Sequence, residues 1–239
     1  MNPPDRERPA VHIGIVACSA EGAALCYRTI CLDAIPTMGM HDHPRITLSA
    51  IPMARHMECI EREDWEGVAE LMLDGAREVA AAGAAFAICP DNTLHQALPL
   101  VRPKSPIPWL SIADVVTEEA VRRGFRRLGV LGTRYLMEGP VYRDAVDARG
   151  IEMRIPPPDA RRRINRAIFD ELVNAIFRDG TRRMFSEEID GLRAEGCDAA
   201  VLGCTEIPLL VRAEDSSLPI LDSTRLLARA ALERALSEA

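Results

Sequence analysis

Apolar positions in this chain fall into two kinds of segment, which alternate along its length. Short apolar runs bounded by glycine or proline predict strands that are covered on both faces. Longer stretches with apolar residues three and four positions apart predict helices. The clearest of these is Trp65–Ala82, which Gly83 terminates. The alternation indicates an α/β protein with parallel sheets.

The pattern places each element on a definite stretch of the chain. The predicted strands are His12–Ala17, Ile46–Ile51, Phe86–Cys89, Trp109–Ile112, a run beginning at Leu128, Ile151–Ile155, Ala199–Leu202 and Pro219–Leu221. Besides Trp65–Ala82, the predicted helices are Cys18 to about Ala34, Ala113–Arg123, Gly139–Arg149, Arg163–Glu195 with a break near Asp179, a short helix opening at Pro208, and Arg225–Ser237. Pro52–His56 is expected to be a loop, and residues 1–9, rich in proline and charge, are expected to be disordered.

One pattern occurs twice. Gly196 is followed by an apolar run and then by Cys204, eight residues on, and Gly83 is followed in the same way by Asp91. In parallel α/β sheets, ligands bind in loops beyond the carboxyl ends of strands. Cys204 and Asp91 are therefore the first candidates for chemistry.

A second pair of segments supports the repeat, because IGIVACS aligns with LGVLGT and superimposes Gly14 on Gly129. The two repeat offsets are 113 and 115 residues. Such a duplication predicts two similar α/β domains, residues 10–113 with 222–239 and residues 114–221. If the two halves face each other, Asp91 and Cys204 lie on opposite sides of one cleft.

Composition narrows the possible partners. The chain has 239 residues, 48% of them hydrophobic and 27% charged, which suits a globular protein with a well-buried core. A net charge of −7 argues against nucleic acid or an anionic membrane as partner. The seven cysteines lack metal-binding spacing, and the amino-terminal segment is polar rather than an apolar secretory signal. We therefore expect free thiols, no metal and a cytoplasmic location.

Each candidate also has a structural interpretation. Cys204 precedes Thr205 and Glu206 close to a helix start, a position that favours the thiolate and exposes the sulfur; buried structural cysteine is the alternative. Asp91 opens the polar run DNT, where an aspartate acts in chemistry or caps the following helix. Ser19 either caps the first helix or contacts a ligand.

Several segments together closely resemble the aspartate/glutamate/hydantoin racemase superfamily. They are LGCTEIPLL at 202–210, DNTLH at 91–95, the opening IGIVACSAEGA, and LGT at 131–133 followed by Tyr142. The resemblance spans roughly residues 12–236. It implies two pseudo-symmetric α/β domains with the active site in the cleft between them, a homodimer, and catalysis without pyridoxal phosphate or metal.

In that superfamily two cysteines flank the substrate α-carbon as acid and base, and the second of them matches Cys204. The first falls on Asp91, which is a departure, although a carboxylate also transfers protons. The family positions that hold the substrate carboxylate match Asn92, Thr93 and Thr205. Those that line the pocket match Ser19 and Thr133, for both of which helix capping is the alternative interpretation.

A second departure concerns the substrate. Relatives specific for dicarboxylates carry a lysine where this chain has Ile176, so aspartate and glutamate are disfavoured unless Arg55 supplies the charge. The sequence thus predicts a cofactor-independent racemase or epimerase of a small carboxylate. Two alternatives are a decarboxylase or lyase that uses Cys204 as proton donor, and a carboxylate-binding protein without activity. A maleate-type isomerase is disfavoured, since position 91 lacks a thiol.

Overall fold

A computed structural model describes residues 10–238, which form two compact units. The first contains the described residues up to Ile112 together with those from Leu227 onward, and the second is Ala113–Leu226. The predicted fold class is confirmed, because the protein is α/β with one parallel sheet in each unit. The domain boundaries inferred from the repeat stay a prediction.

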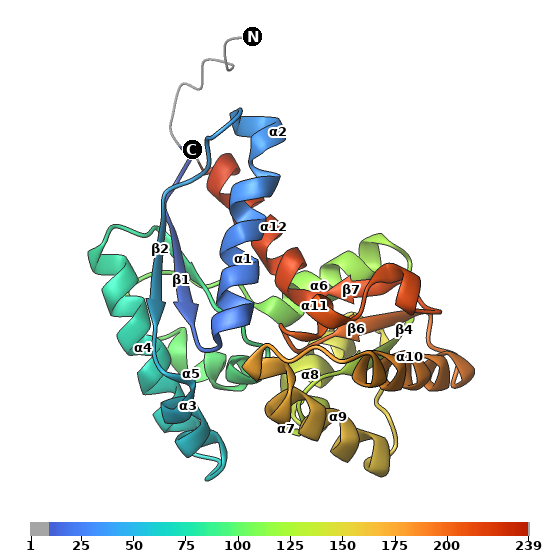
Figure 1. Cartoon of the computed structure of the whole chain (residues 1–239). Coiled ribbons are helices and arrows are strands. Elements are labelled where there is room, and N and C mark those ends of the chain that lie inside the picture. The colour runs from blue at the N-terminus through green and yellow to red at the C-terminus, as the bar shows by residue number, and fades with distance from the viewer. Residues whose placement is uncertain (1–9, 239) are drawn as a thin grey trace. The chain divides into compact units, whose positions relative to one another are not determined.

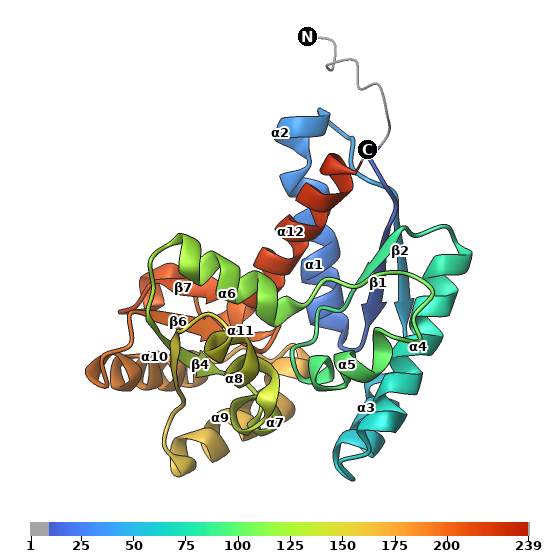
Figure 2. The same cartoon turned by 180° about the vertical axis from the view of Figure 1, so that it is seen from behind.

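The first unit is built on a three-stranded parallel sheet in the order β2-β1-β3. Its strands are β1 (Ile13–Ala17), β2 (Ile46–Ala50) and β3 (Phe86–Ile88). Its helices are α1 (Ala20–Asp33), α2 (Ile35–Met38), α3 (Met53–Ile60), α4 (Trp65–Ala81), the 3₁₀ turn η1 (Thr93–Ala97) and α5 (Leu98–Val101). Figures 1 and 2 show α1 and α4 on opposite sides of β1, as successive right-handed crossovers require.

The second unit has a four-stranded parallel sheet in the order β5-β4-β6-β7. Its strands are β4 (Arg127–Leu131), β5 (Glu152–Arg154), β6 (Ala199–Leu202) and β7 (Ile220–Asp222). Its helical segments are α6 (Ile112–Arg122), α7 (Arg134–Glu138), α8 (Pro140–Asp147), α9 (Pro158–Asp170), η2 (Leu172–Asn174), α10 (Asp179–Ala194), α11 (Ile207–Leu210) and η3 (Ala213–Asp215). The long helical region is interrupted over residues 171–178, just before the predicted break near Asp179, which is the first residue of α10.

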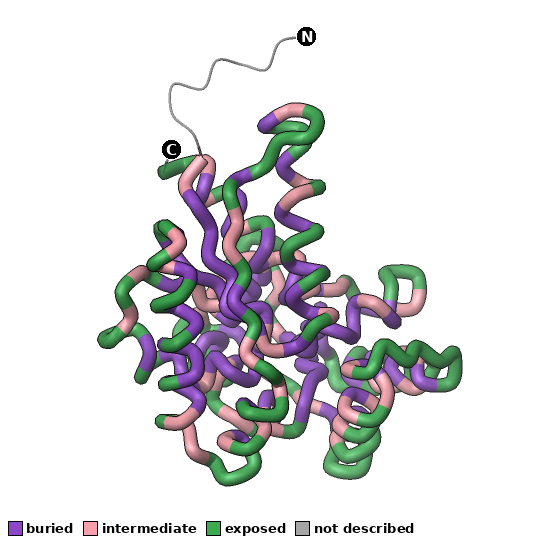
Figure 3. The backbone as a smooth tube through the Cα atoms, turned by 60° about the vertical axis from the view of Figure 1, so that its left-hand side comes forward, coloured by how far each residue is buried: buried purple, intermediate pink, exposed green. Residues whose placement is uncertain are grey.

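Glycine allows a helix to lie close against the central strand of each sheet. A Cβ added at Gly14 of β1 would lie 2.6 Å from Val79 Cγ2 of α4, and one added at Gly129 of β4 would lie 2.7 Å from Leu192 Cδ1 of α10. The two glycines that the sequence repeat superimposes therefore have the same structural role. The central strand β1 is buried along its whole length (Figure 3).

The last helix, α12 (Ser223–Ser237), begins in one unit and ends in the other. At its start, the Ser223 hydroxyl donates to the carbonyl oxygen of Leu202 at 2.8 Å. Near its end, the carbonyl of Ala235 accepts the amide of Val11 at 3.0 Å, and the Arg234 guanidinium lies 4.6 Å from the centre of the Phe86 ring. Residues 227–238 thus complete the first unit from the far end of the chain.

Two local predictions were wrong. Trp109 makes only a single bridge to Ala87, and Ile112 already belongs to α6, because prolines at 106 and 108 cannot donate ladder hydrogen bonds. The expected loop Pro52–His56 is instead the first turn of α3, for which Pro52 is the residue before the helix. The predicted disorder of residues 1–9 lies outside the described residues. No helix within 10–238 combines the length and apolar character needed to span a bilayer.

Ala175 is strained, because it adopts left-handed backbone angles, φ 56° and ψ 31°. An L-residue with a Cβ pays roughly 1 kcal/mol there, whereas glycine does not. We expect Ala175→Gly to raise the free energy of unfolding by about 0.5 kcal/mol or more, measured by urea denaturation. The matched control is Ala167→Gly inside α9, which should lower it by about 0.5–1 kcal/mol. Equal effects of the two changes would contradict this account.

His56 on α3 is fully buried, and neither ring nitrogen has a hydrogen-bond partner among residues 10–238. Burial, assisted by the charge of Arg55, lowers the pKa of His56 from 6.5 to about 4. The unfolded chain therefore takes up this proton more readily than the folded one. The contribution of neutral His56 to the free energy of unfolding should be fully present above pH 6.5. It should be lost as the pH falls toward 4, a total of ~3 kcal/mol.

The His56→Leu variant should lose this part of the pH dependence. Urea unfolding at about pH 7.5 and about pH 5 would give the free energies for both proteins. We expect a difference between the two pH values that is about 2 kcal/mol smaller in the variant. The same pH dependence in both would show that His56 is not responsible.

Candidate functional site

Cys204 lies just beyond the carboxyl end of β6, in a turn that begins with Gly203 and leads into α11. The amide of Gly203 donates to the Leu131 carbonyl of β4 at 2.7 Å, which extends the ladder to the residue before the cysteine. The carbonyl of Cys204 then accepts the amide of Ile207 at 3.1 Å and closes the turn into α11. The cysteine is thereby held at the end of the sheet.

The sulfur of Cys204 is buried, contrary to the expectation that this position exposes it. Its residue is 7% exposed and packs in an apolar cluster with Leu131, Ile207 and Leu210, among others. The thiol donates to Glu206 Oε2 at 3.0 Å, and the Thr205 hydroxyl donates to the same oxygen at 3.1 Å. Glu206 is only 2% exposed, so three polar side chains share one buried site.

Glu206 is the residue that the sequence reasoning missed. The sequence places Glu206 directly after Thr205, near the start of a helix, and that pattern alone indicates no role for it. The available signal was its position two residues after Cys204, since side chains at that spacing in a tight turn can meet. The other carboxylate oxygen, Oε1, is buried and has no hydrogen-bond partner in the described part of the chain.

Asp91 follows β3 in the first unit and lies two residues before the 3₁₀ turn η1. Its Oδ1 accepts the amide of Leu94 at 3.1 Å, so the capping function considered from the sequence is present. Cys89, two residues earlier, is fully buried, and burial together with the nearby Asp91 carboxylate raises the pKa of its thiol well above 9. Cys89 therefore stays protonated and does not supply the missing thiolate.

Asp91 and Cys204 hold equivalent places in the two sheets. Gly14 pairs with Ala87, and Asp91 lies four residues after Ala87. Gly129 pairs with Ala200, and Cys204 lies four residues after that alanine. The register of the strands thus gives the same alignment as the sequence repeat, and each residue occupies the carboxyl edge of its own sheet.

The remaining predicted residues divide between the same two edges. Ser19 Oγ accepts the amide of Gly22 at 3.2 Å as the cap of α1, and Thr133 Oγ1 accepts the amide of Leu136 at 3.2 Å as the cap of α7. Asn92, Thr93 and Thr205 are all buried. The structure therefore groups Ser19, Asp91, Asn92 and Thr93 at the edge of the first sheet, and Thr133, Cys204 and Thr205 at the edge of the second.

His95, the histidine of the DNTLH segment, is structural. Its Nδ1 accepts the amide of Ile112 at 3.2 Å, so Nε2 carries the proton and donates to the Cys89 carbonyl at 3.1 Å. The ring thus joins η1 to the end of β3 and the start of α6. Among residues 10–238, no three His, Cys, Asp or Glu side chains are grouped in a way that suits a metal ion.

Two parallel sheets, one of three strands and one of four, give this α/β protein a racemase-like fold. A family model for Asp/Glu/hydantoin racemases matches residues 15–231. The chain therefore belongs to the Asp/Glu/hydantoin racemase family.

Solved structures agree with this assignment. The chain is 30% identical to a Yersinia pestis protein provisionally described as an Asp/Glu racemase, with a TM-score of 0.84, and the match covers 95% of this chain and 99% of that one. It is 26% identical to an aspartate racemase homologue from Pyrococcus horikoshii OT3, with a TM-score of 0.81 over 94% and 99% of the two chains. Glutamate racemase from Aquifex pyrophilus shares the fold at 18% identity, with a TM-score of 0.65 over 92% and 82%.

The glycine before the cysteine should be needed for this geometry. A Cβ on Gly203 would lie 2.5 Å from Leu136 Cδ2 and 3.0 Å from the Leu131 carbonyl oxygen. We expect Gly203→Ala to lower the free energy of unfolding by about 1–3 kcal/mol, measured by urea denaturation. Gly191→Ala within α10, where an added Cβ meets nothing within 4 Å, should be neutral or stabilising. A neutral Gly203→Ala would mean that the turn adapts freely.

Proposed function

We propose that this protein is a cofactor-independent racemase or epimerase of an amino acid or a related small carboxylate, with Cys204 and Asp91 as its two proton-transfer groups. The observation that carries the proposal is the equivalent register position of these two residues in the two repeated units. Family membership and the racemase designations of the similar structures support it.

The proposed reaction exchanges a proton at the α-carbon. The Cys204 thiolate removes the proton on one face, so that the Cα–H bond breaks, an S–H bond forms, and the electron pair stays on the substrate as a carbanion. Asp91, protonated at that moment, returns a proton on the other face. In the opposite direction the roles of the two groups are exchanged, so one of them must be protonated when the other is not.

Polar side chains beside the two groups suit the substrate carboxylate. Asn92 and Thr93 follow Asp91 and bring an amide and a hydroxyl donor to that group. Thr205 follows Cys204, but its hydroxyl proton is donated to Glu206, which leaves its backbone amide as the donor proposed for the substrate. Donors aimed at developing negative charge give the electrostatic stabilisation that usually contributes most to such a reaction. Ser19 and Thr133 are proposed to line the same pocket. Cytoplasmic location and homodimer formation stay predictions from the sequence.

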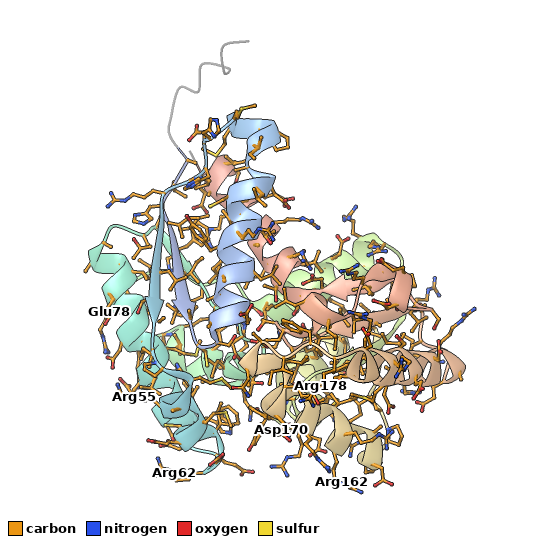
Figure 4. The ribbon with its side chains drawn as sticks, in the orientation of Figure 1. Arg55, Arg62, Glu78, Arg162, Asp170 and Arg178 are labelled. Carbon is orange, nitrogen blue, oxygen red and sulfur yellow. The ribbon has the colours of Figure 1, made fainter. Side chains whose placement is uncertain are left out.

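The substrate is proposed to lack a second carboxylate. Ile176 stands where dicarboxylate-specific relatives are expected to have lysine. The cation nearest to it in sequence, Arg178, forms an ion pair with Glu171 at 2.8 Å, and Figure 4 marks its place. With that charge already neutralised, an apolar or neutral substrate side chain fits this segment better than aspartate or glutamate.

One observation favours the second candidate, a decarboxylase or lyase. Asp91 Oδ1 accepts a backbone amide, so part of this carboxylate serves the local turn. In that reaction, carbon dioxide leaves the substrate, and the Cys204 thiol protonates the resulting carbanion without help from a second acid. Turnover of a malonate-type acid without racemisation of any amino acid would favour this candidate.

Proton NMR in deuterated water tests the first candidate. The protein is incubated with a panel of amino acids, hydantoins and malonates, and loss of each Cα–H signal is followed. We expect exchange with inversion for at least one compound. Cys204→Ala should reduce the exchange by at least about a hundredfold, since it removes a general acid–base group. Asp91→Asn should abolish inversion.

The matched control is Cys197→Ala, which removes another buried cysteine of the same unit. Burial raises the pKa of the Cys197 thiol to about 11, and this residue should have no part in exchange. Exchange at the wild-type rate in Cys204→Ala would refute the mechanism. Binding of a compound without any exchange or turnover would identify a carboxylate-binding protein.

A further inference from the structure

The buried Glu206 carboxylate is only half explained by its contacts. Oε2 accepts two hydrogen bonds, from the thiol of Cys204 at 3.0 Å and from the hydroxyl of Thr205 at 3.1 Å. Oε1 is buried and accepts no hydrogen bond from any residue between 10 and 238. Within the described residues no ion pair involves Glu206, and its neighbours Cys204 and Ile207 belong to an apolar cluster. An ionised carboxylate in such a place loses hydration that nothing replaces in full.

We propose that Glu206 is the proton acceptor of Cys204, so that the thiol and the carboxylate share one proton. In the transfer the S–H bond breaks, an O–H bond forms on Oε2, and the electron pair stays on sulfur. The inference rests on the proposed function for its catalytic meaning, because it supplies the thiolate that takes the α-proton.

The contacts explain why the proton would move. After transfer the carboxyl group is neutral, and leaving a neutral carbonyl oxygen such as Oε1 without a partner costs less than leaving an anionic one. The negative charge then lies on sulfur. The hydrogen bond already lies along the transfer path, so no side chain needs to change its rotamer.

Sharing a proton would also give Cys204 both of its proposed roles. With the proton on Glu206 the sulfur is a base, and with the proton on sulfur it is an acid. Glu206 would act through Cys204 rather than on the substrate, which makes it a positioning and proton-holding residue. Titrations of the two groups would then be coupled and would belong to the pair.

Titration of the sulfur by ultraviolet absorbance tests this without any substrate. A thiolate absorbs in the far ultraviolet where a thiol does not, and subtracting the Cys204→Ala spectrum isolates residue 204. We expect a thiolate signal near neutral pH in the wild-type protein. In Glu206→Gln, which keeps the shape and an acceptor oxygen, we expect that signal to be about tenfold smaller and to reappear only at higher pH.

Two further variants keep the outcome clear. Glu214→Gln changes a glutamate whose side chain is 68% exposed and should leave the titration unchanged. Thr205→Val removes the competing donor from Oε2 and should keep or increase the thiolate signal near neutral pH. If Glu206→Gln does not fold, judged by circular dichroism, the Thr205→Val result decides, and a smaller signal in that variant overturns the proposal.

Two other results would also overturn it. One is a wild-type protein without thiolate near neutral pH, and the other is a Glu206→Gln variant whose signal is equal or larger. The outcome is separate from that of the exchange experiment. If the thiolate signal depends on Glu206 but the protein shows no α-proton exchange, the Cys204–Glu206 pair is supported and the racemase proposal is refuted.

Discussion

The close approach of a helix to a central strand is the interaction on which both units depend. Gly14 admits Val79 of α4 at a distance that no Cβ would allow, and Gly129 admits Leu192 of α10 in the same way. Because interiors are close-packed, this contact fixes the height of the helix over the sheet and hence the loops at its ends. The loops at the carboxyl edges, which carry Asp91 and Cys204, are positioned by these packed layers.

The two candidate groups have equivalent positions but different surroundings. Cys204 is enclosed by apolar side chains and meets a carboxylate, whereas Asp91 is partly exposed and meets a backbone amide. A low-dielectric surrounding strengthens the hydrogen bond between the Cys204 thiol and the Glu206 carboxylate, whereas partial solvation weakens electrostatic interactions around Asp91. The duplicated fold therefore provides two equivalent sheet edges whose candidate residues differ in burial and in hydrogen-bond partners.

Much of this fold could be predicted from the sequence, because its strands are apolar runs with clear boundaries. Ala199–Leu202 has the predicted bounds, since glycines bracket it, and the Gly14–Gly129 alignment agrees with the strand register. The apolar pattern of a segment gave a wrong prediction where the adjoining residues determine whether a strand can pair. Trp109 is a residue type common in strands, but the prolines in the adjoining segment cannot donate the hydrogen bonds of a longer strand pairing.

The candidate site was predictable in part for a related reason. A motif identifies Cys204 by its place after a strand, but the burial of its sulfur depends on side chains from distant segments, such as Leu131. The contact with Glu206 depends on rotamers that no spacing rule fixes. The capping bonds of Ser19 and Thr133 are local, and serine and threonine at helix starts already indicate them.

The last helix has a consequence for the order in which the chain folds during synthesis. The second unit is continuous in sequence, so a ribosome has delivered all of it before residues 227–238 are made. Until residues 227–238 emerge, the first unit lacks the part of α12 that bonds to Val11 and lies against Phe86. Although domains usually fold in the order of their synthesis, here the half that is made first is completed last.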